Sequence, residues 1–163
     1  MAKKGKNVWE DLKGVKETLT EDLTIKMGEV EVTFPVKFVD YDEIQEINRQ
    51  YDDKLPEKPV INIDIGNKRH SIRVPNAQEK FESFNDHPKA KEWQEKAAPV
   101  ERERKARIAY EFIADDFKPG ETVEEGVEFL LEELREMDRL AITEKGFELN
   151  GISERLDKAE KNS

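Results

Sequence analysis

Apolar and polar residues alternate in two short runs, residues 23–27 and 30–34, which are separated by Gly28-Glu29. Alternation with a period of two predicts strands that bury one face, and a two-residue loop that begins with glycine favours a type II′ hairpin turn. Closing this turn pairs the apolar residues across the strands and places them on one face. They are Leu23, Ile25, Met27, Val30, Val32 and Phe34. Pro35 cannot donate a ladder hydrogen bond, so we expect an edge or a bulge there.

A helix follows this hairpin. Asp40 is a good N-cap with Glu43 as its capping partner. Apolar residues then recur at helical spacing, at Ile44, Ile47 and Tyr51. We expect the helix to end near Asp52-Asp53, because Pro56 and Pro59 follow and the residue before a proline disfavours helical backbone.

A second hairpin is predicted from Val60 to Val74, with Gly66-Asn67 as its turn and Ile63 opposite His70. Two hairpins with an intervening helix predict an α+β fold with a small antiparallel sheet. The chain from Pro75 onward has helical patterns, so we expect a helical C-terminal half.

Several features divide that half. Asn76 caps a short predicted helix, and a longer one spans residues 89–117, where Pro99 predicts a kink or two helices. A heptad seam then predicts one helix from Val123 to Ala141, with Gly146 as its C-terminal stop. The seam residues are Val123, Val127, Leu130, Leu134, Met137 and Ala141. Near the N-terminus, apolar residues between Val8 and Val15 predict one or two helical turns that dock on the main body.

These patterns suggest four parts. Residues 1–22 form an N-terminal tail and short helix, and residues 23–75 form the two-hairpin α+β part. Residues 76–146 form a helical part packed on it, and residues 147–163 form a C-terminal tail that is a candidate for folding on binding.

Composition narrows the function classes. The 163 residues include 38 acidic and 28 basic side chains, a net charge of −10, and no cysteine. Lack of cysteine excludes disulfides, thiolate zinc sites and cysteine nucleophiles. Neither a membrane span nor a signal peptide is evident, so we expect a soluble intracellular protein.

Catalytic motifs are absent from the sequence. Neither His70 nor His87 lies in a zinc-binding pattern, and the glycines and serines form no phosphate loop or nucleophile elbow. The acidic pairs neighbour Lys or Arg at helical spacing or lie at helix ends, which is typical of a solvated surface. They are Asp52-Asp53, Asp115-Asp116, Glu124-Glu125 and Glu132-Glu133. We therefore expect a non-enzymatic protein with no catalytic residues, metal or cofactor.

Nucleic-acid binding is disfavoured. Residues 89–107 hold seven basic residues but also four acidic ones, and the total charge opposes phosphate binding. Residues 121–163 sum to −7, which leaves open a mimic of nucleic acid, although basic residues are mixed in.

The helical half also has an apolar flank beside its seam, formed by Phe129, Leu131 and Phe147. This flank either packs internally or receives an amphipathic helix from another protein. Glu128 and Glu132 are acidic neighbours that suit a basic partner face.

The stretch from Leu23 to Val60, an apolar hairpin that runs into a capped helix, resembles the N-terminal part of tail assembly chaperones of long-tailed bacteriophages. The likeness covers the front third of the chain well and the helical remainder in outline. It implies a non-enzymatic chaperone that coats the helical tape-measure protein and helps recruit tail-tube subunits, with self-association as an open option. It also implies a protein of the infected host cytoplasm that is not retained in the mature virion.

Many such chaperones are made in two lengths by a ribosomal frameshift, and Glu160-Lys161-Asn162 can be encoded by a slippery run of A's. A second hypothesis is an acidic phage protein that inhibits a host nucleic-acid-binding enzyme. A hydrolase that uses paired carboxylates is a distant third.

Overall fold

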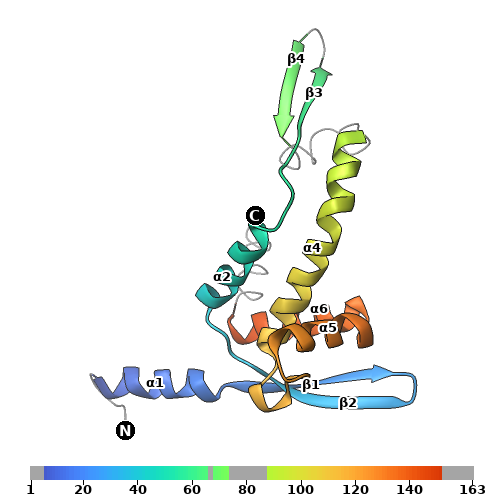
Figure 1. Ribbon diagram of the computed structural model, residues 1–163. Helices are drawn as coiled ribbons and strands as arrows, with labels where there is room; N and C mark the ends of the chain where they lie inside the picture. The colour runs from blue at the N-terminus through green and yellow to red at the C-terminus, as the bar shows by residue number, and fades with distance from the viewer. Residues whose placement is uncertain (1–5, 66–67, 74–87, 152–163) are drawn as a thin grey trace. The chain divides into compact units, whose positions relative to one another are not determined.

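The computed structural model describes residues 6–65, 68–73 and 88–151. The chain divides into two compact units, one formed by Met1–Ile47 with Lys105–Ser163 and the other by Asn48–Arg104. Antiparallel hairpins and helices confirm the α+β class and the helical C-terminal half (Figure 1). The units follow different boundaries from the expected ranges 23–75 and 76–146, because the first unit joins the N-terminal hairpin to the C-terminal helices.

The first hairpin pairs β1 (Thr20–Met27) with β2 (Val30–Lys37) in the predicted register. Met27 lies opposite Val30, and Leu23 lies opposite Phe34. Gly28 has a φ of 62°, which the first position of a primed turn requires and which glycine adopts without strain. Local alternation and turn chemistry therefore specify this hairpin.

Pro35 lies at an edge position of β2, and pairing with β1 continues through it without a bulge. Its carbonyl accepts a hydrogen bond from the amide of Ala114 at 3.1 Å, on the side away from β1. Since the amide nitrogen and carbonyl of one antiparallel residue point to the same side, the missing N–H costs the β1–β2 ladder nothing.

Two helices flank this hairpin in the chain. The helix α2 (Tyr41–Asp52) has the predicted ends. The helix α1 (Lys6–Thr18) is longer than the one or two turns expected, and Trp9, Leu12 and Val15 are exposed rather than docked, with Trp9 at 70%. Its last turn is fastened by Lys16, which lies over the Phe38 ring and forms an ion pair with Asp40 at 3.7 Å.

The long predicted helix is the single α4 (Pro88–Phe112), so Pro99 does not divide it into two helices. A short 3₁₀ turn, η1 (Asp115–Phe117), follows it. Beside η1, Ile113 forms a bridge with Val36 of β2.

The helix predicted from Val123 to Ala141 is wrong as a single element. It is two helices, α5 (Val123–Glu133) and α6 (Glu136–Leu149), because Leu134 and Arg135 have extended backbone. The break changes which side chains are buried: Val127, Leu130 and Ile142 lie in the core, whereas the seam residue Met137 is 65% exposed.

The expected stop at Gly146 is also wrong, since α6 continues to Leu149. A Cβ atom at Gly146 would lie 2.2 Å from Cδ1 of Phe112. Glycine is therefore required here by close packing against α4. The predicted tail 147–163 accordingly begins inside a helix.

The unit Asn48–Arg104 contains the second hairpin, β3 (Val60–Ile65) with β4 (Lys68–Arg73), again in the predicted register with Ile63 opposite His70. Within the described residues, each hairpin is a separate two-stranded sheet and not part of one common sheet. In this unit the indole of Trp93 donates to the carbonyl of Pro56 at 3.0 Å, and Arg104 pairs with Asp52 at 2.7 Å. The predicted turn at 66–67, the helix after Asn76 and His87 lie outside the described residues.

The contact at Gly146 makes a prediction against helix propensity. Replacing glycine by alanine inside a helix normally adds up to about 1 kcal/mol of stability. We expect Gly146→Ala instead to lower the free energy of unfolding by about 1–3 kcal/mol, because the new methyl group overlaps the Phe112 ring. Urea denaturation measures the change.

Gly14→Ala is the matched control, since no atom lies within 4 Å of a Cβ at this position of α1. We expect it to leave stability unchanged or slightly higher. A stabilising Gly146→Ala substitution would contradict the packing.

Candidate partner-binding surface

The corner between α5 and α6 is built by two consecutive buried charged residues, Asp138 and Arg139. The Asp138 carboxylate accepts hydrogen bonds from the backbone amide of Arg135 at 3.3 Å and from its guanidinium at 2.8 and 3.0 Å. The hydrogen bond from Arg135 holds the pKa of Asp138 below its usual range. This carboxylate thus caps the amino end of α6, because it accepts from the backbone amide of the N-cap residue Arg135.

Arg139 caps the other helix of the corner, at the carboxyl end of α5. Its Nη1 atom donates to the carbonyl of Leu130 at 3.1 Å and to that of Leu134 at 2.5 Å. These carbonyls lie at the carboxyl end of α5, where a cation also complements the helix dipole. Together the two residues stop α5 and turn the chain into α6.

α6 is fastened to β1 at both ends. The guanidinium of Arg135 donates to the carbonyl of Lys26 at 2.8 Å, and the ammonium of Lys145 pairs with Glu21 at 2.9 Å. The helical rise from Arg135 to Lys145 is about 15 Å, and the strand rise from Glu21 to Lys26 is about 17 Å. The anchors are therefore matched in spacing, and α6 lies along the hairpin (Figure 1).

This arrangement leaves the outer face of α5 exposed. At its amino end the Thr122 hydroxyl accepts from the amide of Glu125 at 3.2 Å. On its inner side Gly126 contacts Tyr110, while Val127 and Leu130 are buried. The outward side chains therefore project from a helix that is well fixed on the other side.

An aromatic ring lies among carboxylates on that outer face. Phe129 is 47% exposed. One helical row places it between Glu125 and Glu133, and the adjacent row contains Glu124, Glu128 and Glu132. We call these six residues the α5 acidic face.

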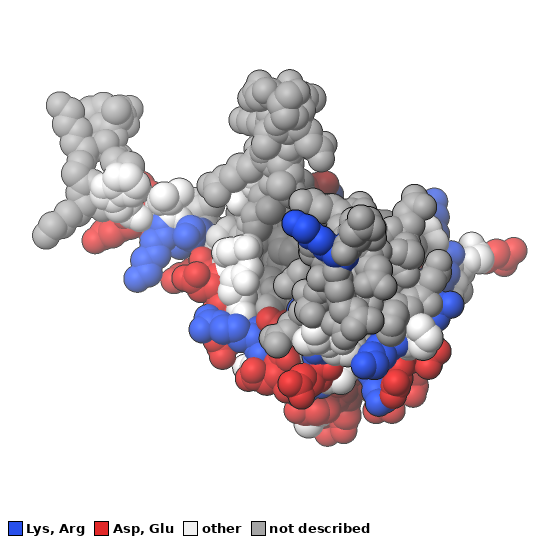
Figure 2. Space-filling view, turned by 90° about the horizontal axis from the view of Figure 1, so that it is seen from above, with Lys and Arg blue, Asp and Glu red and all other residues white. Residues whose placement is uncertain are grey.

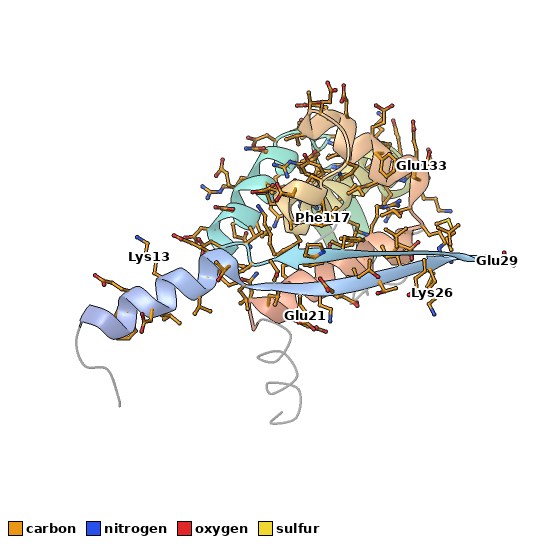
Figure 3. The ribbon with its side chains drawn as sticks, turned by 90° about the horizontal axis from the view of Figure 1, so that it is seen from below. Lys13, Glu21, Lys26, Glu29, Phe117 and Glu133 are labelled. Atoms are coloured by element: carbon orange, nitrogen blue, oxygen red, sulfur yellow. The ribbon has the colours of Figure 1, made fainter. Side chains whose placement is uncertain are left out.

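The α5 acidic face has no basic side chain of its own. Residues 121–134 contain six glutamates and no lysine or arginine. In the part of the chain that the structure describes, none of the glutamates at 124, 128, 132 and 133 is in an ion pair. Figure 2 shows acidic side chains along the lower edge of that view with some basic side chains among them, and Figure 3 shows Glu133 on α5.

The structure brings together only part of the residue set expected from the sequence. Phe129, Glu128 and Glu132 share the exposed face of α5. Leu131 is half-buried on the same helix. Phe147 is on α6, half-buried in an edge-to-face contact with Phe112 at 5.4 Å between ring centroids, so its ring belongs to the internal packing.

The sequence did not predict that several other apolar side chains are exposed. They are Met27, Val30 and Val32 on the hairpin and Met137 and Leu140 on α6. Alternation predicted burial of the three hairpin residues, and the heptad seam predicted burial of Met137. Leu140 lies outside that seam.

A cluster of ion pairs fixes η1 to β2, on the chain path that leads into α5. Asp115 accepts from Lys37 at 2.8 Å and from Lys118 at 3.0 Å. The hydrogen bond from Lys37, with that from Lys118, lowers the pKa of Asp115 to about 2. The carboxylate therefore fastens the connector between α4 and α5 when it is ionised.

The described residues offer little for bound ions or small ligands. They contain no group of three His, Asp or Glu residues placed to hold a metal ion, and no described helix is long and apolar enough to cross a membrane. A hollow of about 510 Å³ in the unit Asn48–Arg104 is bordered by Trp93, and Lys96 pairs with Glu92 at its rim at 3.0 Å. The acidic pair Asp52-Asp53 is also engaged, through Arg104.

Comparisons with protein-family models, with curated proteins and with solved structures found no match to this chain.

The Asp115 cluster predicts how stability depends on pH. Because the pKa of Asp115 is lower in the folded state than its ordinary 3.8, its contribution to stability is present above pH 4 and is lost as the pH falls toward 2. Asp115→Asn should therefore lower the melting temperature at pH 7, and the difference from the unmodified protein should shrink between pH 4 and pH 2. Thermal unfolding followed by circular dichroism at several pH values measures this.

Asp116→Asn serves as the control, because within the described residues its side chain has no ion pair. An equal effect of the two substitutions at every pH would rule out the proposed role of the cluster.

Proposed function

We propose that this protein is a non-enzymatic chaperone of phage tail assembly that binds and solubilises the helical tape-measure protein and helps recruit tail-tube subunits. The observation that carries the proposal is the α5 acidic face, an exposed aromatic ring among glutamates, four of which form no ion pair with any described residue. The resemblance of residues 23–60 to such chaperones supplies the identity of the client. The protein would act in the cytoplasm of the infected cell.

The chemistry of this face favours a basic amphipathic helix as the bound segment. Apolar residues of the client would cover Phe129, and lysines or arginines beside them would meet the carboxylates on either side. An aromatic anchor in the centre of a contact contributes most of its affinity, whereas charged residues at the rim act mainly on orientation and association rate.

The same acidic face gives some support to a second function, an acidic phage protein that occupies the nucleic-acid site of a host enzyme. Such a mimic would depend on the carboxylates and would bind less tightly as salt increases. It would not need an exposed phenylalanine among the carboxylates. The ring at position 129 therefore favours the chaperone, and its substitution separates the two functions.

The first test uses co-expression of the full chain with fragments of the tape-measure protein encoded in the same genome. We expect the chain to raise the soluble yield of a helical, basic fragment and to co-purify with it. Phe129→Ala should weaken binding by roughly 30-fold, the effect of an anchor worth about 2 kcal/mol. Phe117→Ala, which removes another exposed ring, should not. Absence of both co-purification and added solubility would refute the proposal.

The second test reverses charge on the α5 acidic face. The double substitution Glu128→Lys with Glu132→Lys should slow association with the fragment, and the difference should narrow as salt increases. Glu95→Lys with Glu103→Lys on α4 changes the net charge equally at exposed positions and should bind normally. Surface plasmon resonance at two salt concentrations measures the rates. Equal slowing by both variants would show that net charge alone matters.

A further inference from the structure

The strand β2 has an open outer edge over part of its length. In an antiparallel strand, residues whose backbone groups point away from the partner alternate along the chain. The carbonyl of Pro35 points away from β1, because it accepts the amide of Ala114. By the same alternation, the N–H and C=O groups of Thr33 and Glu31 point outward.

These outward groups lack a backbone partner among the described residues. The Val36–Ile113 bridge and the Ala114–Pro35 hydrogen bond cover only the base of this edge. From Val30 to Thr33 every residue is exposed, with Val30 at 64% and Val32 at 52%. The turn at Glu29 is the far end of the hairpin (Figure 3). An uncovered strand edge beside exposed valines is a template for pairing with another strand.

We propose that this edge pairs with the same edge of a second copy of the chain, so that two hairpins join into one antiparallel four-stranded sheet. In the register that fits, Val32 lies opposite Val32 of the second copy. Glu31 then exchanges backbone hydrogen bonds with Thr33 of the second copy, and the reverse pair forms by symmetry.

Two features of the strand select this register. Centring the pairing on Glu31 would place two carboxylates opposite each other, which is destabilising. Centring it on Thr33 would place Glu31 opposite Pro35, which has no N–H and whose carbonyl is already bonded to Ala114. Only the register centred on Val32 uses both outward residues without a charge conflict.

The side chains also match in this register. On the apolar face, Val32 meets its own copy and Val30 meets Phe34 of the second copy, which is half-buried in the single chain. On the polar face, each Glu31 lies opposite a threonine and keeps its own ion pair with Lys26 at 3.4 Å. The edge is thus complementary to itself in charge and in apolar contact, which favours a second copy over a different strand.

The absence of cysteine from the chain allows a direct test. Residues at a non-hydrogen-bonded antiparallel position have their Cβ atoms close enough for a disulfide. The purified Val32→Cys variant should form a disulfide-linked dimer under mild oxidation, seen on a non-reducing gel. Thr24→Cys, an exposed position on β1 of the same hairpin, should form far less.

Charge substitution at the symmetry axis gives a second, independent readout. Val32→Lys and Val32→Glu should each be monomeric by sedimentation over roughly 1 µM to 1 mM, a range suited to a small interface. Mixing the two variants should restore the dimer, because only a register centred on this position brings opposite charges together. Circular dichroism confirms that each variant remains folded.

Several outcomes would overturn the inference. One is that the unmodified chain stays monomeric over the whole concentration range. The others are that Val32→Cys and Thr24→Cys crosslink equally, and that a mixture of Val32→Lys and Val32→Glu stays monomeric. Crosslinking of Val32→Cys to a client strand alone would assign the edge to the client instead. Phe129→Ala should dimerise normally, so failure of the dimer and failure of client binding through α5 are separate results.

Discussion

The corner at Asp138 and Arg139 is the constraint on which the rest of the first unit depends. Charged side chains are buried only where their hydrogen bonds are satisfied, and here neighbouring residues serve the ends of two different helices. Ending α5 at this point lets α6 lie along β1, where Arg135 and Lys145 are bonded to the strand. The same turn exposes the outer face of α5 and its glutamates.

The placement of charge follows from this geometry. Basic residues of the C-terminal helices are used internally, with Arg139 capping α5 and Lys145 fastening β1. Among the described residues, the glutamates at 124, 128, 132 and 133 of α5 form no ion pair, so their carboxylates are accessible to solvent or to a partner. The sequence pattern indicates acidic residues dispersed over a solvated surface. The fold instead places the glutamates of α5 together on one side of the helix, around Phe129.

Much of the fold was predictable from residues near one another in the chain. Gly28 and the alternation around it predicted the register of the first hairpin, and Asp40 marked the start of α2. The heptad seam misled because the spacing of apolar residues does not report a backbone break. For the candidate site, the sequence identified Phe129, Glu128 and Glu132, but it could not separate them from Phe147, whose ring is covered by Phe112 of a distant helix.

Local chemistry thus determined the two hairpins, which segments are helical, and which acidic and apolar residues were candidates for the binding surface. These features depend on turn conformation and on side-chain periodicity over a few residues. Tertiary structure decided which apolar side chains stay exposed, where α5 ends and why Gly146 is glycine. Each of these depends on atoms brought close by folding, such as the Phe112 ring against Gly146 and the Arg139 guanidinium against the end of α5.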